Sequence, residues 1–187
     1  MNIEKIKENL KNIYEEIIYF EEVNSTQTYI KQKYKENILL KETIVIANVQ
    51  TDGKGTHGRI WESEKGKNIL LTIALFPNCK IEKLKNLTIT IAENIIEVID
   101  NLYKIKLEIK APNDIILNGK KLGGILTETI IQNENVKCLF IGIGINVNGE
   151  NFSKDISKTA TSLKKEFNKE FSRENIIIEI AKKLYKY

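Results

Sequence analysis

The 187-residue sequence has few of the thiol and imidazole side chains that bind zinc or form disulfides, with two cysteines and one histidine. Cys79 and Cys138 are far apart and lack the CxxC spacing, so neither a zinc site nor a disulfide framework is indicated. Cys138 lies in the apolar run from Val136 to Ile145, where we expect a buried free thiol.

Long apolar runs and an excess of one charge are also lacking. No stretch approaches the ~18 uninterrupted apolar residues of a membrane span, and the charged, amphipathic start has no apolar segment typical of a signal peptide. We therefore expect a cytoplasmic protein. The net charge is only +4, a weak argument for a nucleic-acid partner.

Arginine is nearly absent, since only Arg59 and Arg173 occur among 29 basic residues. A retained arginine therefore carries more information here than a single lysine, because lysine cannot reproduce the planar fork that grips phosphate or carboxylate.

What the sequence has is an ordinary globular composition, 42% hydrophobic and 29% charged, and a length that suits one domain with a real core. Apolar spacing predicts helices at 3–17, 26–34, 84–102 and 173–187, and strands at 17–23, 43–50, 68–76, 107–110, 115–118, 121–131 and 136–147. Ser25 or Thr26 is expected to cap the second helix, and Ser172 the last. The long helix at 84–102 is apolar so far round that we expect it to be covered on both sides.

Two turns indicate how the last strands pair. Asn118-Gly119 favours a tight hairpin, and the polar turn Gln132–Asn135 joins the next two strands. Adjacent hairpins imply antiparallel pairing rather than βαβ units. The predicted fold class is α+β: a mixed, mainly antiparallel sheet backed by helices.

A glycine-rich loop follows the strand that ends near Gln50. Its glycines free the backbone to fold its N–H groups around an anion, and Lys54 and Arg59 add positive charge. A mobile hairpin explains the loop equally well, and the P-loop pattern GxxxxGK[ST] is absent. Trp61 is either a core anchor or a lid over a flat heterocycle, and His57 reads as an exposed loop residue.

Three later segments carry similar signals. In Lys110-Ala111-Pro112-Asn113-Asp114 a lysine at a strand end is placed inward, where a charge needs a partner, although a solvated lysine before turn formers is the simpler reading. Paired glycines inside 121–128 suit a strand whose backbone another group approaches closely. In 142–148 alternate glycines precede Asn146, whose amide could read the edge of a base; a bulge would explain either glycine segment.

Together and in this order, the segments closely resemble the signature set of biotin–protein ligases: Ser25-Thr26-Gln27, Gln50 with Gly58-Arg59-x-Trp61, Lys110-x-Pro112-Asn113-Asp114, Lys121-Leu122-Gly123-Gly124-Ile125-Leu126 and Gly142-x-Gly144-x-Asn146. The match runs from about Phe20 to Leu163. The resemblance implies a fold like that of class II aminoacyl-tRNA synthetases. It also implies a two-step reaction: ATP and Mg²⁺ convert biotin to biotinyl-5′-AMP, and a lysine of a biotin carboxyl carrier protein, as in acetyl-CoA carboxylase, then takes the biotinyl group.

The resemblance also implies residue roles. Lys110 would face both the biotin carboxylate and the α-phosphate, and Arg59 would add charge for the triphosphate, which makes these two the catalytic candidates. Biotin would be bound by Lys110 and by Ser25, Thr26, Gln27, Gln50, Lys54, Gly55, Thr56 and Gly124. ATP would be bound by Arg59, Trp61 over the adenine, Asn146 at its edge, Asn113 and Lys121. No metal ligand is indicated.

The sequence departs from the family pattern in three places. Lys54 and Thr56 replace two arginines of the loop, and Ala111 replaces a tryptophan of the biotin pocket. The chain also stops in the helix after which family members carry a small β-barrel. We expect residues 1–187 to be a single catalytic domain, without the N-terminal DNA-binding domain of some members and with the β-barrel absent or truncated.

Two other functions compete with this interpretation. A biotin-sensing repressor or binding module is disfavoured because only one helix precedes the pattern, and we expect no DNA or membrane partner. A lipoate-type ligase shares the fold, but the Lys110 segment and the glycine loop favour biotin. The resemblance leaves a homodimer open.

Overall fold

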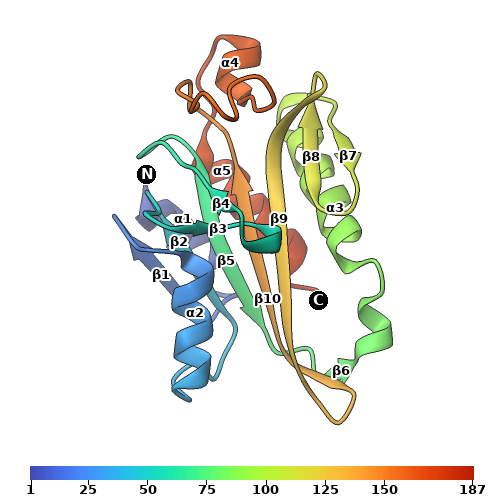
Figure 1. Ribbon diagram of the computed structural model, residues 1–187. Coiled ribbons are helices and arrows are strands. Elements are labelled where there is room, and N and C mark those ends of the chain that lie inside the picture. Colours follow the sequence, from blue (N-terminus) through green and yellow to red (C-terminus); the bar gives the residue numbers. More distant parts are fainter.

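The computed structural model describes all residues from Met1 to Tyr187. Its centre is an eight-stranded sheet in the order β1-β2-β5-β10-β9-β8-β7, with β6 paired to β10 (Figure 1). Its strands are β1 (Glu16–Phe20), β2 (Thr43–Ala47), β5 (Ile69–Leu75), β6 (Cys79–Lys80), β7 (Glu108–Lys110), β8 (Asp114–Leu117), β9 (Lys120–Gln132) and β10 (Asn135–Ile145). A separate two-stranded ribbon is made by β3 (Gly53–Lys54) and β4 (Ile60–Trp61).

The sheet is mixed and mainly antiparallel, as the sequence predicts. Only β1 and β2 pair in parallel, and the other neighbours run antiparallel. Both expected hairpins form. Asn118 and Gly119 have φ of 50° and 74°, and Asn133 and Glu134 have φ of 50° and 63°. Positive φ at both central residues is the requirement of the tight turn that matches strand twist.

The helices divide unequally between the two faces of the sheet. Those of the chain are α1 (Ile3–Leu10), α2 (Thr26–Lys35), α3 (Leu87–Tyr103), α4 (Leu163–Phe167) and α5 (Arg173–Leu184). A cluster of 34 buried residues joins α1, α3 and α5 to one face, and a cluster of six joins α2 to the other (Figure 1). The second face is therefore only partly covered by helix, which leaves part of it open for a ligand.

Strand β5 shows how the residues sort between the faces. Ile69, Leu71 and Ile73 belong to the large cluster, whereas Ala74 belongs to the small one and Thr72 lies on the same side as Ala74. All residues of β5 are buried, so the strand is covered on both sides. Helix α3 is likewise enclosed between α5 and the strands β7 to β9, which confirms its predicted cover on two sides.

Most local predictions are confirmed. Ser25 Oγ accepts a hydrogen bond from Thr28 N at 3.3 Å and caps α2, and Ser172 Oγ accepts one from Asn175 N at 3.2 Å and caps α5. Cys138 is a buried free thiol. Burial raises its pKa to about 12. No helix is both long and apolar enough to cross a membrane.

Several boundaries and elements were predicted wrongly. Strands β1 and β2 end at Phe20 and Ala47, three residues before the predicted ends at Val23 and Gln50. Helix α1 ends at Leu10 rather than Ile17, because the chain turns so that the buried Tyr14 can donate its hydroxyl to Ala181 O at 2.9 Å. The segment Thr51–Lys67 is not a plain loop, since it forms the β3–β4 ribbon around a 3-10 turn (Thr56–Gly58). Elements α4 and β6 were missed because five and two residues are too short to show a period.

Candidate active site

A cavity of about 690 Å³ lies on the sheet face that carries α2, beside the β3–β4 ribbon. Its volume is in the ordinary range for a small-molecule site, roughly 300–1,000 Å³. Every site residue expected from the sequence lines it: Ser25, Thr26, Gln27, Gln50, Lys54, Gly55, Thr56, Arg59, Trp61, Lys110, Asn113, Lys121, Gly124 and Asn146. The fold thus brings together residues that are up to 121 positions apart, from Ser25 to Asn146.

Glycines of β9 and β10 line this cavity because Trp61 packs directly on them. A Cβ added at Gly144 would lie 2.4 Å from Trp61 Cε2, and one at Gly124 would lie 3.0 Å from Trp61 Cζ3. The prediction that another group approaches these glycines is confirmed, and that group is the indole. Lys121 Nζ lies 5.6 Å from the centroid of the same ring. Trp61 is therefore an anchor on the sheet and a wall of the cavity at once.

At the end of the cavity nearest α2, polar side chains bond to one another. Gln50 Oε1 accepts from Thr26 N at 2.8 Å and from Thr26 Oγ1 at 3.0 Å, and Thr26 Oγ1 also lies 2.8 Å from Thr72 Oγ1. Gln27 is only 4% exposed and donates its Nε2 to Glu128 Oε2 at 2.8 Å. Its Oε1 has no partner. This end therefore offers fixed polar groups in an enclosed space.

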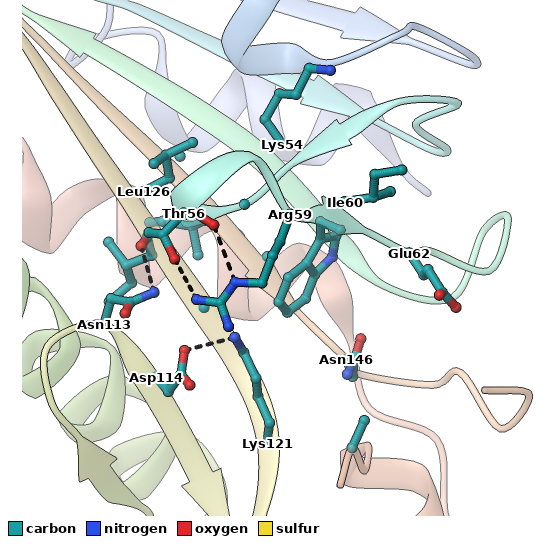
Figure 2. Close-up of a pocket in the computed structure, with 18 of the residues that line it drawn as sticks. Lys54, Thr56, Arg59, Ile60, Glu62, Asn113, Asp114, Lys121, Leu126 and Asn146 are labelled. Carbon is teal, nitrogen blue, oxygen red and sulfur yellow. Dashed lines mark hydrogen bonds and ion pairs between the residues drawn. The ribbon is translucent and has the colours of Figure 1, made fainter. Parts of the chain in front are cut away.

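In the ribbon, the one arginine of the loop is folded back on its own turn. Arg59 donates Nη2 to Thr56 Oγ1 at 2.9 Å and Nε to Thr56 O at 3.2 Å. Figure 2 shows Arg59 turned toward Asp114 and Lys121, while Lys54 points away from them. Lys54 is instead ion-paired with Asp52.

The remaining cations differ in their pairing. Lys121 Nζ lies 2.7 Å from Asp114 Oδ1, whereas Lys110 takes part in no ion pair. Of the two interpretations of Lys110, the solvated lysine is confirmed, because this residue is exposed although it also lines the cavity. Water therefore solvates this charge, and no buried partner is required. Asn113 donates Nδ2 to Ile125 O at 3.3 Å (Figure 2).

Residues 19–146 match the model of the biotin/lipoate A/B protein ligase family. The chain belongs to this family. It is 35% identical over 166 residues to the bifunctional ligase/repressor BirA of Bacillus spizizenii, which covers 88% of the chain and 51% of that protein. The chain thus spans about half the length of this curated relative.

Solved structures of family members agree with the fold. The biotin protein ligase of Aquifex aeolicus in complex with biotin and ATP has a TM-score of 0.77 and 28% identity, covering 91% of this chain and 69% of that one. The biotin protein ligase of Leishmania major in complex with biotinyl-5-AMP has a TM-score of 0.73 and 27% identity, covering 91% and 73%. The α+β class with a mixed, mainly antiparallel sheet is that of these ligase structures.

Two residues of this family member were not singled out from the sequence although they contribute to the site. Lys158 lines the cavity from a segment without regular structure, which is tied to β9 where Lys121 N donates to Thr159 O at 2.7 Å. Glu128 bonds Gln27 from β9. Lys158 belongs to no recognisable motif, so nothing in the sequence pointed to it. Glu128 ends the glycine-containing segment 121–128, and its place in that motif could have identified it.

Proposed function

We propose that the chain is an ATP-dependent ligase that adenylates biotin to biotinyl-5′-AMP and transfers the biotinyl group to a lysine of a biotin carboxyl carrier protein. One observation carries the proposal: the residues that the biotin–protein ligase resemblance assigns to biotin and to ATP all line one cavity. The family match and the similarity to a ligase solved with biotin and ATP support it.

In the first step, a carboxylate oxygen of biotin attacks the α-phosphorus of ATP, and pyrophosphate leaves. Both reactants are anions, so a fixed cation near the point of attack lowers their repulsion in the transition state. Lys110, which has no carboxylate partner, is the cation that we assign to this task. We assign the ring of biotin to the enclosed end, where Ser25, Thr26, Gln27 and Gln50 would hold it.

For ATP, we assign the adenine to Trp61 and Asn146, and the phosphates to Arg59 and Lys121. Asn146 is 5% exposed and lies across the cavity from Asn113 (Figure 2). We propose that Asn113 fixes the β7–β8 turn next to the phosphates through its bond to Ile125 O.

We propose Mg²⁺ as a cofactor that arrives with the nucleotide. The structure has no cluster of three or more His, Cys, Asp or Glu side chains that could hold an ion. This fits Mg²⁺, which proteins bind through one or two carboxylates together with substrate phosphates. Asp114 lines the cavity beside Lys121 and is the carboxylate that we assign to the ion. When bound, Mg²⁺ would neutralise charge on the phosphates.

In the second step, the amine of a carrier lysine attacks the biotinyl carbonyl, AMP leaves and an amide forms. The open side of the cavity, where Lys110 meets solvent, is the path that we assign to this lysine. We propose that the described residues form a single catalytic domain. Both cysteines are free, which suits a reducing compartment, and we propose the cytoplasm.

Biotin-dependent exchange of pyrophosphate into ATP tests the proposal directly. Exchange that requires biotin is expected, and exchange that requires lipoate instead would assign the chain to the lipoate branch. A thermal shift with each acid alone gives an independent reading, because a ligand that binds the folded state raises the melting temperature. Exchange with neither acid would contradict the proposal.

A further inference from the structure

Gln27 has an acceptor that the folded chain leaves unused. The side chain lies on the first turn of α2 and is only 4% exposed, yet its Oε1 has no hydrogen-bond partner. A buried carbonyl without a donor costs free energy, so native proteins rarely keep one without a reason. The oxygen lies over β10, where a Cβ added at Gly142 would be only 2.8 Å away. Both Gln27 and Gly142 line the cavity.

The opposite end of the same amide is held by Glu128. Gln27 donates Nε2 to Glu128 Oε2 at 2.8 Å, and Lys31, one turn along α2, makes an ion pair with Glu128 Oε1. Burial raises the pKa of the Glu128 carboxyl, but the hydrogen bonds from Lys31 and Gln27 outweigh it and the pKa lies below its usual value. Glu128 is therefore an ionised group that only accepts hydrogen bonds.

An ionised carboxylate permits only one orientation of the neighbouring amide. If the Gln27 amide rotated by half a turn, its oxygen would face the Glu128 oxygens, and two acceptors would repel each other. The pairing with Glu128 thus keeps the amide nitrogen directed at Glu128 on β9 and the carbonyl oxygen over Gly142 of β10. Lys31 supplies the charge that keeps Glu128 ionised while it is partly buried.

We propose that Glu128, held by Lys31, is a positioning residue that fixes the Gln27 carbonyl as an acceptor for an N–H group in the ring of the substrate. This inference rests on the proposed function and deepens it, because it names what selects the substrate. A ureido ring carries N–H donors, whereas the dithiolane ring of lipoate carries none. Sites built to bond a polar group reject an analogue that lacks it, because their own polar atom stays unpaired.

The test compares the binding of three acids to the intact chain: biotin, dethiobiotin, which keeps the ureido N–H groups but lacks the thioether ring, and lipoate. In Glu128→Gln the neighbour can donate as well as accept, so the Gln27 amide loses its fixed orientation. We expect the Kd for biotin and for dethiobiotin to rise about 5- to 20-fold, the worth of one oriented hydrogen bond. Binding of lipoate should not weaken, so the preference for ureido acids should fall by the same factor.

The chain offers a matched control on the same helix. Glu36, the C-cap residue of α2, also accepts from a glutamine and a lysine, namely Gln32 Nε2 at 2.9 Å and Lys33 Nζ at 3.1 Å, but it is exposed and does not line the candidate site. Glu36→Gln should leave all three affinities unchanged. Glu128→Asp keeps the charge on a side chain one methylene shorter, and it should keep more of the biotin preference than Glu128→Gln.

The possible failures are distinguishable. If the unaltered chain binds biotin, and Glu128→Gln binds biotin and dethiobiotin as tightly as the unaltered chain does, the positioning role is wrong and the proposed function stands. An equal loss for all three acids, together with a lower melting temperature, would show a merely structural role and also overturn the inference. If the unaltered chain binds no biotin, the proposed function fails and the inference fails with it.

Discussion

Lys110 lines the cavity, is exposed and has no carboxylate partner, while Lys54 and Lys121 are each neutralised by a neighbouring aspartate. Of these three lysines only Lys110 has no carboxylate partner, and it is the one to which we assign the two anions of the proposed reaction. Lys110→Ala should lower the rate of biotinyl-AMP formation ~100-fold or more, the usual effect of losing one preorganised charge. Single-turnover formation of the adenylate measures this step.

Lys106→Ala is the control, because Lys106 is an exposed lysine of the same segment that does not line the cavity. Both variants should keep the melting temperature of the unaltered chain, since neither side chain is buried. Near-normal adenylate formation by Lys110→Ala would show that the charge comes from another residue, such as Lys158.

Thr56 is the second residue with a defined consequence. Its hydroxyl and carbonyl hold Arg59 within the turn, so the loop presents one restrained guanidinium instead of the two that an arginine at position 56 would give. A charged donor binds phosphate more strongly than a hydroxyl does. Thr56→Arg should slow the dissociation of biotinyl-AMP roughly 10- to 100-fold, equivalent to ~1.5–3 kcal/mol.

Dissociation of biotinyl-AMP and the labelling of a bystander protein are the two measurements. Thr51→Arg places the same charge in the same segment outside the cavity and should change neither. If Thr56→Arg also changes neither, the loop retains the adenylate through other residues.

Among the elements, the β3–β4 ribbon has few stabilising hydrogen bonds. It pairs only two residues with two, and the turn between them is closed by hydrogen bonds such as Gly55 N to Arg59 O at 2.8 Å. So few bonds give little protection against local opening. We predict rapid amide hydrogen exchange in Thr51–Lys67 without ligand, and slower exchange by at least ~10-fold with biotin and ATP together.

The neighbouring strand β5 is the internal reference for that experiment, because all of its residues are buried and paired on both sides. Its exchange should be slow with and without ligand. Equally slow exchange in the ribbon under both conditions would contradict the prediction.

Elements with a strong period were predictable from the sequence, and elements held by distant contacts were not. The β9–β10 hairpin follows from alternating apolar residues and a polar turn, and α3 follows from its apolar spacing. By contrast, α1 ends where Tyr14 reaches Ala181, a residue 167 positions away. Likewise, the glycines in β9 and β10 predicted that another group packs closely on these strands, but only the structure shows that this group is the Trp61 side chain.

For the whole molecule, the buried thiol Cys138 sets a pH limit. Burial raises its pKa from 9.0 to about 12, so in the folded chain the thiol stays protonated where the unfolded chain has lost its proton. The stabilisation is complete below pH 9 and is lost as the pH rises toward 12. The free energy of unfolding should therefore fall above pH 9 by up to about 1.4 kcal/mol per pH unit.

Urea unfolding at several pH values from 8 to 10.5 measures this slope. Cys138→Ala should flatten it more than Cys79→Ala, because Cys79 is only half-buried. Burial raises the pKa of Tyr14 as well, so part of the slope should persist at the alkaline end. An unchanged slope in Cys138→Ala would contradict the assignment.

The residues that line the cavity could be predicted from the sequence, but the contacts between their side chains could not. The motifs named the residues that line the cavity correctly, although these residues lie on the first turn of α2, on the β3–β4 ribbon and on strands of the main sheet. Pairing was not predictable: neither the Lys121–Asp114 ion pair nor the turn that holds Arg59 follows from spacing. Such contacts depend on the orientation of each side chain within a turn or between paired strands, which a linear pattern does not encode.

The position of Trp61 makes intrinsic tryptophan fluorescence a probe of the cavity. Trp61 is the only tryptophan, so all indole emission comes from one wall of the cavity. Its ring packs on the glycines of β9 and β10, and Lys121 Nζ lies 5.6 Å from the ring centroid. Indole fluorescence responds to a nearby charge and to contact with water, both of which would change if a nucleotide stacked on the ring or drew Lys121 toward its phosphates, as we propose. Binding of each substrate can thus be followed in the unlabelled protein, and a signal that responds to ATP but not to biotin would map which ligand reaches that wall.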